Sequence, residues 1–285
     1  MHTKTELLAL LRGHNLRLSK RLGQSYLVDP RLTERLVNAC GVTRHDTVIE
    51  IGAGLGALTD LLAARAKRVV AVEVDRAVCE VLKHRMARMK NVEVRCQDIL
   101  TVAWSKYAGS KVIGAVPYHI TSPILISLCE ANHHIPEVWL GLQREVVQRL
   151  CATPGTKAYG RLSLLVQYRF VVEERLRMSR HAFFPAPAVD SAWIRLSARP
   201  SADLSAAEEA LLFEVVRAAF AQRRKTFVNG LSQLASPRLE RAQAVELIHQ
   251  VGFREDVRGE DLALEDFVRL AKTLGEQQRE TTRMM

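Results

Sequence analysis

The feature that most constrains the fold is a strand, a glycine-rich turn and an apolar helix that follow one another between residues 47 and 66. Residues 47–51 have the β-branched, apolar character of a buried strand. The turn contains Gly52, Gly54 and Gly56, which can adopt positive φ angles and let the backbone approach a ligand closely. A strand that passes through such a turn into a helix is typical of an α/β sheet.

Helix-like and strand-like segments continue to alternate beyond this unit. The further predicted strands are residues 69–74, 92–95, 112–113 and 138–142. Residues 75–87 are amphipathic, and Asp29 and Pro30 supply the N-cap and first position of an earlier helix that Gly41 closes. This alternation implies crossover connections, and it predicts an α/β fold with a mostly parallel sheet and helices on both faces.

The pattern changes after Pro200. The last part of the chain predicts three helices without an intervening strand, at residues 204–221, 239–251 and 264–274. We therefore expect a larger α/β domain over residues 1–200 and a small all-helical domain over residues 201–285. The polar residues 276–285 are expected to fray.

Composition excludes several classes of protein. Of the 285 residues 48% are hydrophobic and 25% are charged, which is typical of a globular chain and not of a disordered one. No apolar run approaches the length of a membrane span, and residues 7–11 are too short for a secretory signal. The five cysteines include no CxxC pair, which argues against a disulfide scaffold or zinc ribbon and for a reducing compartment. The net charge of +10 suggests a polyanionic partner such as nucleic acid.

Acidic residues stand at the ends of three successive strands. Glu50 precedes Gly52 by two positions, and the GxGxG pattern differs from the GxGxxG fingerprint of dinucleotide sites. An acid at this point would repel a pyrophosphate but attract the sulfonium and ammonium groups of S-adenosylmethionine. Glu73 could accept the ribose hydroxyls, and Asp98 could accept the adenine amino group. The pattern favours S-adenosylmethionine over NAD.

Residues 114–121 (GAVPYHIT) follow the fourth predicted strand. Pro117 and Tyr118 would place an aromatic ring and exposed backbone carbonyls at the ligand-binding edge of the sheet. A base flipped out of its stack could pack on Tyr118 while a carbonyl accepts its amino hydrogens. Such acceptors would localise the lone pair of N6 and direct it at a sulfonium methyl group. A simple turn with a packed tyrosine is the other interpretation.

Further motifs follow one another in a fixed order. They are KRLGQSYL at residues 20–27, LQREVVQRL at 142–150, KAYGRLS at 157–163, FFPAPAVDS at 183–191, FAQRRK at 220–225 and NGL at 229–231. In this order they resemble the motifs of the KsgA-type small-subunit rRNA adenine dimethyltransferases, a family related to the Erm 23S rRNA methyltransferases. The resemblance extends from about residue 16 to residue 274, nearly the whole chain.

The resemblance implies a Rossmann-like methyltransferase domain over residues 1–200 and a helical rRNA-binding domain over residues 201–285. It implies transfer of methyl groups from S-adenosylmethionine to N6 of two adjacent adenines near the 3′ end of small-subunit rRNA. A role in biogenesis of the small ribosomal subunit, with binding to the immature subunit, is implied as well. We expect a monomer in the cytoplasm that binds no metal ion and does not associate with a membrane.

The resemblance also assigns site residues. The cofactor would be bound by Ser25, Leu27, Glu50, Gly52, Gly54, Glu73, Asp98 and Ala115. The catalytic site would comprise Ala115, Pro117, Tyr118 and Phe183. Tyr118 would stack on the target adenine and Phe183 would cover its other face. Stacking of this kind contributes about 1–3 kcal/mol per base.

The chain departs from the family pattern at several of these positions. Ala115 stands where the family has Asn, whose side chain is the principal acceptor for the N6 hydrogens. Losing one such group typically costs about 10²–10³ in rate. Backbone carbonyls remain beside it, and His119 is either a partial substitute or a packing residue. Ser25 replaces another Asn, and Ala188 replaces a Lys that would contact RNA.

Two other functions are compatible with the motifs. One is a ribosome-assembly or rRNA-binding factor with weakened or lost methyltransferase activity, which Ala115 would explain. The other is an Erm-like resistance enzyme, which the FAQRRK and KAYGRLS motifs disfavour. In each case we expect RNA along the three most basic stretches, residues 1–24, 140–180 and 223–225.

Overall fold

A computed structural model of the chain describes residues 3–19, 21–200, 203–222, 224–236 and 238–284. Lys20 and Arg223, which belong to two of the motifs, and Ser201 and Ala202, at the start of the expected helical domain, lie outside the described residues. The chain divides into two compact units. The first comprises residues 1–147 and 170–198, and the second comprises residues 148–169 and 199–285. Residues 148–169 thus group with the helical part, although the sequence placed them in the first domain.

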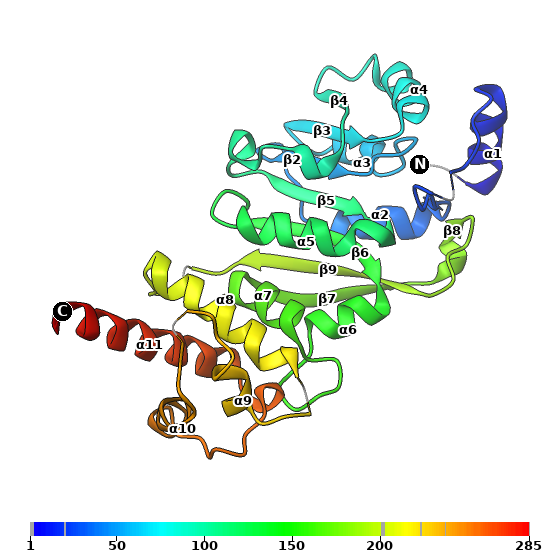
Figure 1. Cartoon of the computed structure of the whole chain (residues 1–285). Coiled ribbons are helices and arrows are strands. Elements are labelled where there is room, and N and C mark those ends of the chain that lie inside the picture. The colour runs from blue at the N-terminus through cyan, green and yellow to red at the C-terminus, as the bar shows by residue number, and fades with distance from the viewer. Residues whose placement is uncertain (1–2, 20, 201–202, 223, 237, 285) are drawn as a thin grey trace. The chain divides into compact units, whose positions relative to one another are not determined.

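The first unit is built on a seven-stranded mixed sheet with the order β4-β3-β2-β5-β6-β9-β7 (Figure 1). Its strands are β2 (Thr47–Ile51), β3 (Arg68–Glu73), β4 (Val92–Cys96), β5 (Lys111–Ala115), β6 (Glu137–Gln143), β7 (Phe170–Met178) and β9 (Ser191–Ala198). Strands β4, β3, β2, β5 and β6 are parallel, and β9 is antiparallel to β6 and to β7. A separate two-stranded sheet pairs β1 (Tyr26–Leu27) with β8 (Phe183–Phe184).

The helices of this unit include one that begins at the cap predicted at Asp29 and Pro30. They are α1 (Lys4–Gly13), α2 (Pro30–Ala39), α3 (Thr59–Ala63), α4 (Arg76–Met86), α5 (Thr121–Glu130) and the first part of α6 (Arg144–Leu150). The carboxylate of Asp29 accepts the N–H of Leu32 at 3.0 Å at the start of α2, and Asp75 caps α4 in the same way. Helices α2 and α3 pack on one face of the sheet and α5 lies on the other (Figure 1). The predicted α/β fold is confirmed.

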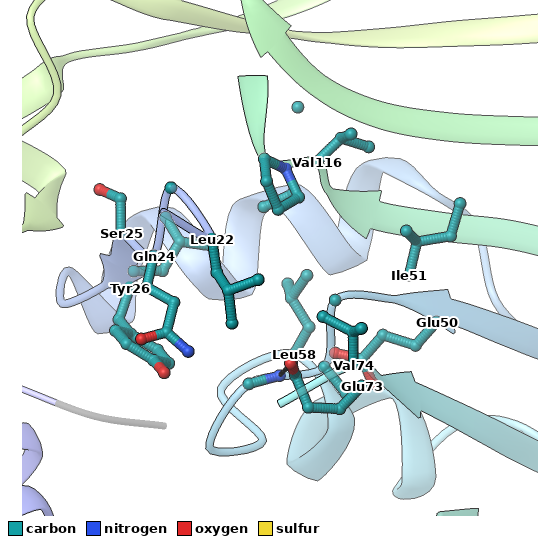
Figure 2. A pocket seen from close by; sticks show the side chains of 18 of the residues that line it. Leu22, Gln24, Ser25, Tyr26, Glu50, Ile51, Leu58, Glu73, Val74 and Val116 are labelled. Carbon is teal, nitrogen blue, oxygen red and sulfur yellow. Dashed lines mark hydrogen bonds between the residues drawn. The ribbon is translucent and has the colours of Figure 1, made fainter. Parts of the chain in front are cut away.

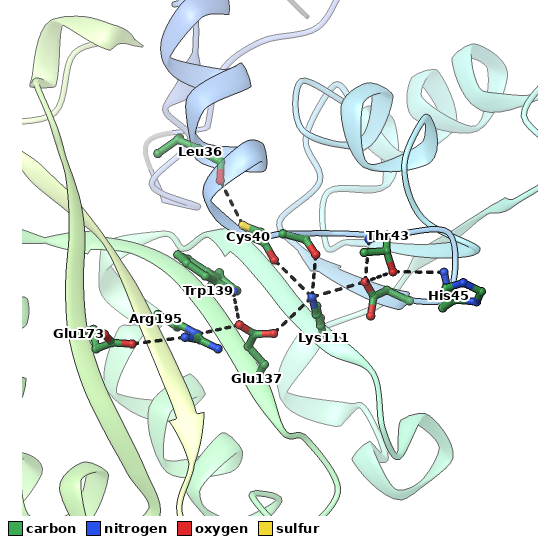
Figure 3. Close-up of polar contacts among 11 residues, drawn as sticks. Leu36, Cys40, Thr43, His45, Lys111, Glu137, Trp139, Glu173 and Arg195 are labelled. Atoms are coloured by element: carbon green, nitrogen blue, oxygen red, sulfur yellow. Dashed lines mark hydrogen bonds and ion pairs between the residues drawn. The ribbon is translucent and has the colours of Figure 1, made fainter.

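A chain of polar contacts ties together the amino-terminal ends of the central strands (Figure 3). Lys111, at the start of β5, donates to the carbonyls of Cys40 and Gly41 at 3.3 and 3.1 Å. The same ammonium group lies 3.4 Å from carboxylate oxygens of both Asp46 and Glu137. Because Lys111 also lies next to the carbonyls that follow α2, it anchors that helix to the sheet.

One disulfide joins Cys79 in α4 to Cys96 in β4, over a sequence separation of 17 residues. The scattered cysteines argued against a disulfide scaffold and gave no indication of this bond. It arises because α4 returns along the sheet and packs beside β4, which brings together two residues that the spacing leaves unrelated.

The second unit is helical. Its helices are α7 (Arg161–Arg169), α8 (Ala206–Ala221), α9 (Phe227–Leu231), α10 (Arg241–Gln250) and α11 (Leu264–Met284). They enclose one apolar core to which Tyr159 belongs, and the hydroxyl of this tyrosine donates to the carbonyl of Leu262 at 3.0 Å. This contact explains why residues 148–169 belong to the helical unit.

The carboxy-terminal tail is helical, so the prediction that residues 276–285 fray is wrong for the described part of the tail. Helix α11 continues to Met284. Gly275 lets α11 approach the side chain of Glu208, where an added Cβ would lie 2.7 Å from Cγ. Arg279 then ion-pairs with Glu208 at 3.1 Å. The ion pair of Arg279 with Glu208 on α8 therefore stabilises the last turns of α11.

Candidate active site

The carboxyl ends of the central parallel strands form one wall of a pocket in the first unit (Figure 2). The glycine turn after β2, Glu73 at the end of β3, Asp98 after β4 and Ala115 at the end of β5 all line it. Parallel strands deliver their carboxyl ends to the same edge of a sheet, which is why residues from four strands meet here. The opposite wall comes from the amino-terminal segment 22–27, called the arm below.

The glycine turn keeps this pocket open. Gly52 and Gly54 have φ angles of 66° and 55°. A Cβ on Gly52 would lie 3.7 Å from the carbonyl oxygen of Ala115, within the space between β2 and β5. A Cβ on Gly54 would lie 2.8 Å from the ring of Tyr26 in the arm. A side chain at Gly54 would therefore collide with the arm, and one at either position would be strained by the positive φ angle.

Glu73 is fixed at the floor of the pocket. Its Oε2 accepts the N–H of Gly54 at 2.8 Å, and its Oε1 accepts the N–H of Asp75 at 2.9 Å. Burial raises the pKa of this carboxyl group, while the two backbone donors lower it. A carboxylate held at a strand end beside a glycine turn is the arrangement that binds ribose hydroxyls in Rossmann-like folds.

Glu50 differs from Glu73. Its side chain is buried, and its Oε2 accepts the hydroxyl of Thr59 at 2.6 Å. Burial raises the pKa of Glu50 to about 8, so the group carries its proton through most of the neutral range. The sequence predicted that Glu50 attracts a cation, whereas burial favours the protonated form of this carboxyl group. Glu73 and Asp98 are the other two of these acids that line the pocket.

Asp98 follows β4 and caps the short 3-10 helix η1 (Ile99–Thr101). Its Oδ1 accepts the N–H of Leu100 at 2.9 Å, and its side chain is exposed at the pocket. Val74 lies beside Glu73 and is 48% exposed, although it is apolar. An exposed valine next to these acids provides a surface on which a flat ring can pack.

Several contacts hold the arm against the pocket. The amide of Gln24 accepts the N–H of Ser19 at 2.7 Å and donates to Asp75 at 2.8 Å. The hydroxyl of Ser25 donates to the carbonyl of Pro185 at 2.6 Å. Leu27 pairs with Phe183 in the small β1–β8 sheet. In Figure 2 the labelled arm residues lie across the pocket from the glycine turn and Glu73.

The aromatic residues of the predicted catalytic site line the same pocket. The hydroxyl of Tyr118 lies 2.7 Å from the hydroxyl of Ser191, and its ring is partly buried. Phe183 is 7% exposed. Desolvation raises the pKa of the Tyr118 phenol, and the hydrogen bond with Ser191 lowers it. The tyrosine is therefore a neutral, oriented ring at neutral pH.

His119 does not line the pocket. Its Nδ1 would lie 3.2 Å from a Cβ on Gly23, so the ring packs against the arm. This position favours the packing interpretation of His119 over a role as substitute acceptor.

The structure brings all the predicted site residues to one pocket. These are Ser25, Leu27, Glu50, Gly52, Gly54, Glu73, Asp98, Ala115, Pro117, Tyr118 and Phe183. The sequence prediction missed other lining residues, namely Leu22, Gln24, Tyr26, Val74, Gln97 and Ile99. Most are sequence neighbours of predicted residues, but their orientation depends on how the arm and the loops fold back.

Three arginines of a basic stretch are paired within the protein. In the basic stretch 140–180, Arg169, Arg175 and Arg177 form ion pairs with Glu209, Glu173 and Glu174. Their charge is thus partly neutralised within the protein.

Among the described residues, no group of three or more His, Cys, Asp or Glu side chains is placed to hold a metal ion. No helix in the described part of the chain is both long and apolar enough to cross a membrane.

Comparison with known proteins extends over nearly the whole chain. Residues 15–276 match the family described as Ribosomal RNA adenine dimethylase. Ribosomal RNA small subunit methyltransferase A of Alkaliphilus metalliredigens is 36% identical over 277 residues, which are 95% of this chain and 96% of that protein. The enzyme of the same name from Bacillus mycoides is 39% identical over 264 residues, 90% of each chain.

Solved structures agree with these sequence matches. A dimethyladenosine transferase from Plasmodium falciparum superposes with a TM-score of 0.76 at 23% identity, over 88% of this chain and 97% of that one. The 23S rRNA methyltransferase ErmE superposes with a TM-score of 0.69 at 27% identity, over 88% of this chain and 99% of that one.

Proposed function

The chain belongs to the ribosomal RNA adenine dimethylase family, and from this membership we propose that it dimethylates N6 of two adjacent adenines near the 3′ end of small-subunit rRNA. S-adenosylmethionine supplies the methyl groups. The reaction contributes to biogenesis of the small ribosomal subunit. The enzyme acts as a monomer in the cytoplasm, where its substrate is assembled.

The glycine turn and the acids around it support the choice of cofactor. Gly54 lets the turn approach the ring of Tyr26 closely, and Glu73 presents a carboxylate fixed by two backbone donors. Asp98 adds an exposed carboxylate, and Val74 an exposed apolar surface, on the same side of the pocket. These residues would hold the nucleoside part of S-adenosylmethionine, and the arm would cover the methionine part.

The aromatic pair supports the choice of target. Tyr118 and Phe183 line one pocket with Glu73, so a flipped adenine can be held beside the cofactor position. Stacking of about 1–3 kcal/mol per base is enough to hold a flipped nucleotide. Orientation of the base and exclusion of water then supply most of the rate enhancement.

Backbone carbonyls take the place of a side-chain acceptor for the N6 hydrogens in this proposal. Ala115 has no polar side-chain atom, but its carbonyl faces the space beside Gly52. One acceptor fewer than the family motif provides reduces the rate without removing the site, and the intact cofactor pocket favours an active enzyme over a decayed one.

The observation that carries this proposal is that Glu73 and Tyr118, from different strand ends, line the same pocket. The test incubates the chain with labelled S-adenosylmethionine and small subunits that lack the modification, and maps the label on the rRNA. Two adjacent N6-dimethylated adenines near the 3′ end are expected. Tight binding of the subunit without transfer of label, in a preparation that binds S-adenosylmethionine, would contradict the proposal.

A further inference from the structure

A cluster of unpaired cations lies at the edge of the sheet opposite the active site. The loops that precede β2, β3 and β4 carry Arg44, Lys67, Arg88 and Lys90, which are called the basic corner below. All four side chains are exposed. Within the described residues, none of them forms a salt bridge, whereas three arginines of the stretch 140–180 do.

Backbone contacts hold these loops side by side. The N–H of Lys67 donates to the carbonyl of Asp46 at 2.9 Å, which joins the loop before β3 to the loop that carries Arg44. The N–H of Val69 donates to the carbonyl of Asn91 at 2.8 Å. The side chain of Asn91 also donates to the carbonyl of Ala63 at 2.8 Å. The four cations therefore belong to one surface.

The acids near the basic corner are already neutralised by other residues. Asp46 contacts Lys111, in the network of Figure 3. Glu93 forms ion pairs with Arg68 and Arg95. The corner therefore keeps an excess of positive charge at its surface.

Helix capping does not account for the cluster. Lys83, His84 and Arg85 occupy the last turn of α4 and complement its dipole. Arg88 and Lys90 lie beyond the end of that helix, and Lys67 lies beyond the end of α3. The dipoles of these helices therefore do not explain the three cations.

We propose that the basic corner binds the phosphate backbone of a second rRNA segment, separate from the one that carries the target adenines. The central strands are five or six residues long, which places the corner about 17 Å from the active-site edge. A nucleotide in the pocket cannot also contact the corner, so the contact requires RNA that folds around the sheet. An assembled small subunit provides such RNA. This inference rests on the proposed function, because that function makes an rRNA particle the substrate.

The test measures binding as a function of salt concentration for a triple variant, Lys67→Gln, Arg88→Gln and Lys90→Gln. The control is Lys83→Gln, Arg217→Gln and Lys272→Gln, which removes the same charge from exposed cations that are paired with Glu80, Glu214 and Asp203. The ligands are the unmodified small subunit and a short RNA that contains the two target adenines. Circular dichroism and thermal unfolding verify that both variants are folded.

Each lost phosphate contact reduces the slope of log K against log salt by about 0.7–0.9. Between 50 and 200 mM salt, three lost contacts therefore change the ratio of wild-type to variant affinity by about 20- to 40-fold. We expect this change for the subunit with the corner variant, and not with the control or with the short RNA. Equal slopes for the two variants, or an equal defect on the short RNA, would overturn the proposal.

Crosslinking identifies the partner. A photoreactive phenylalanine analogue placed at Arg88 should form adducts with rRNA in the bound subunit. Adducts with a ribosomal protein alone would overturn the assignment to RNA. If the chain transfers no methyl groups but shows the salt effect, the proposed reaction fails and this inference stands. If transfer is normal and the slopes are equal, only this inference fails.

Discussion

The hydroxyl groups of Tyr118 and Ser191 lie 2.7 Å apart, which links the loop after β5 to the start of β9. Ser191 is 2% exposed and stands where β9 pairs with both of its neighbouring strands. The orientation of the Tyr118 ring is therefore fixed by the sheet. A site anchored in this way loses little entropy when it orients a base.

This contact predicts different effects for two substitutions of Tyr118. Tyr118→Ala removes the stacking surface and should reduce kcat/KM for the subunit about 5- to 150-fold, equivalent to about 1–3 kcal/mol. Tyr118→Phe keeps the ring and loses only the hydrogen bond, so its effect should be below about 10-fold.

Ser191→Ala is the matched control, because it removes the same hydrogen bond from the other side. Its effect should equal that of Tyr118→Phe, and the double variant should be no worse than either single one. The four variants are compared by their kcat/KM for methyl transfer to unmodified subunits. Equal losses for Tyr118→Phe and Tyr118→Ala would contradict a stacking role.

Ala115→Asn tests the effect of the missing side-chain acceptor. Ala115 lines the pocket at the end of β5, so an amide there would face the ligand space. We expect kcat to rise by up to about 10²–10³-fold, because a preorganised acceptor acts mainly in the transition state. Single-turnover transfer measures this gain, with Ala115→Leu as a control for side-chain size. An unchanged rate for Ala115→Asn would show that the backbone carbonyls already suffice.

Much of the first unit can be predicted from the sequence because its signals are local. Asp29 caps its helix as the sequence indicates, and the apolar runs give the central parallel strands. Strands β7 and β9 could not be predicted in the same way. Charged residues interrupt β7, and the pairing of β9 between β6 and β7 involves residues distant in sequence.

Part of the pocket lining could be predicted for a similar reason, whereas the protonation and contacts of these residues could not. Glu50 and Glu73 were both predicted as site residues because each stands at the end of a predicted strand. Only the three-dimensional structure shows that Glu50 is bonded to the hydroxyl of Thr59, while Glu73 is held by the N–H groups of Gly54 and Asp75. The disulfide between Cys79 and Cys96 likewise depends on helix packing that spacing does not encode.

Glu73→Gln should weaken S-adenosylmethionine binding. The side chain keeps its shape, but an amide provides one acceptor instead of two, so either a ligand hydroxyl or one of the N–H groups of Gly54 and Asp75 loses its partner. An unsatisfied group costs about 1–3 kcal/mol, which corresponds to a rise in Kd of about 5- to 150-fold. Isothermal titration calorimetry measures the Kd. Glu80→Gln, an exposed substitution on α4, is the control and should leave the Kd unchanged.

Glu50 should make the free energy of unfolding fall as pH rises, whereas most carboxylates in folded proteins have the opposite effect. Its pKa of about 8 lies above the ordinary value of 4.5, so the folded chain retains a proton that the unfolded chain releases. Between these two values the free energy of unfolding should fall as pH rises, by up to about 1.4 kcal/mol per pH unit for this group. The contribution is fully present below pH 4.5 and is lost as pH rises to about 8.

Glu50→Gln removes this titration and keeps a group that can accept the hydroxyl of Thr59. The stability of the variant relative to the wild-type chain should therefore increase steadily between pH 5 and pH 8, which urea unfolding at several pH values measures. Glu34→Gln, on the exposed face of α2, is the control and should give a constant difference. A difference for Glu50→Gln that does not change with pH would show that Glu50 is ionised in the folded chain. In that case Glu50 would present a charge to the pocket, as its position at the strand end first suggested.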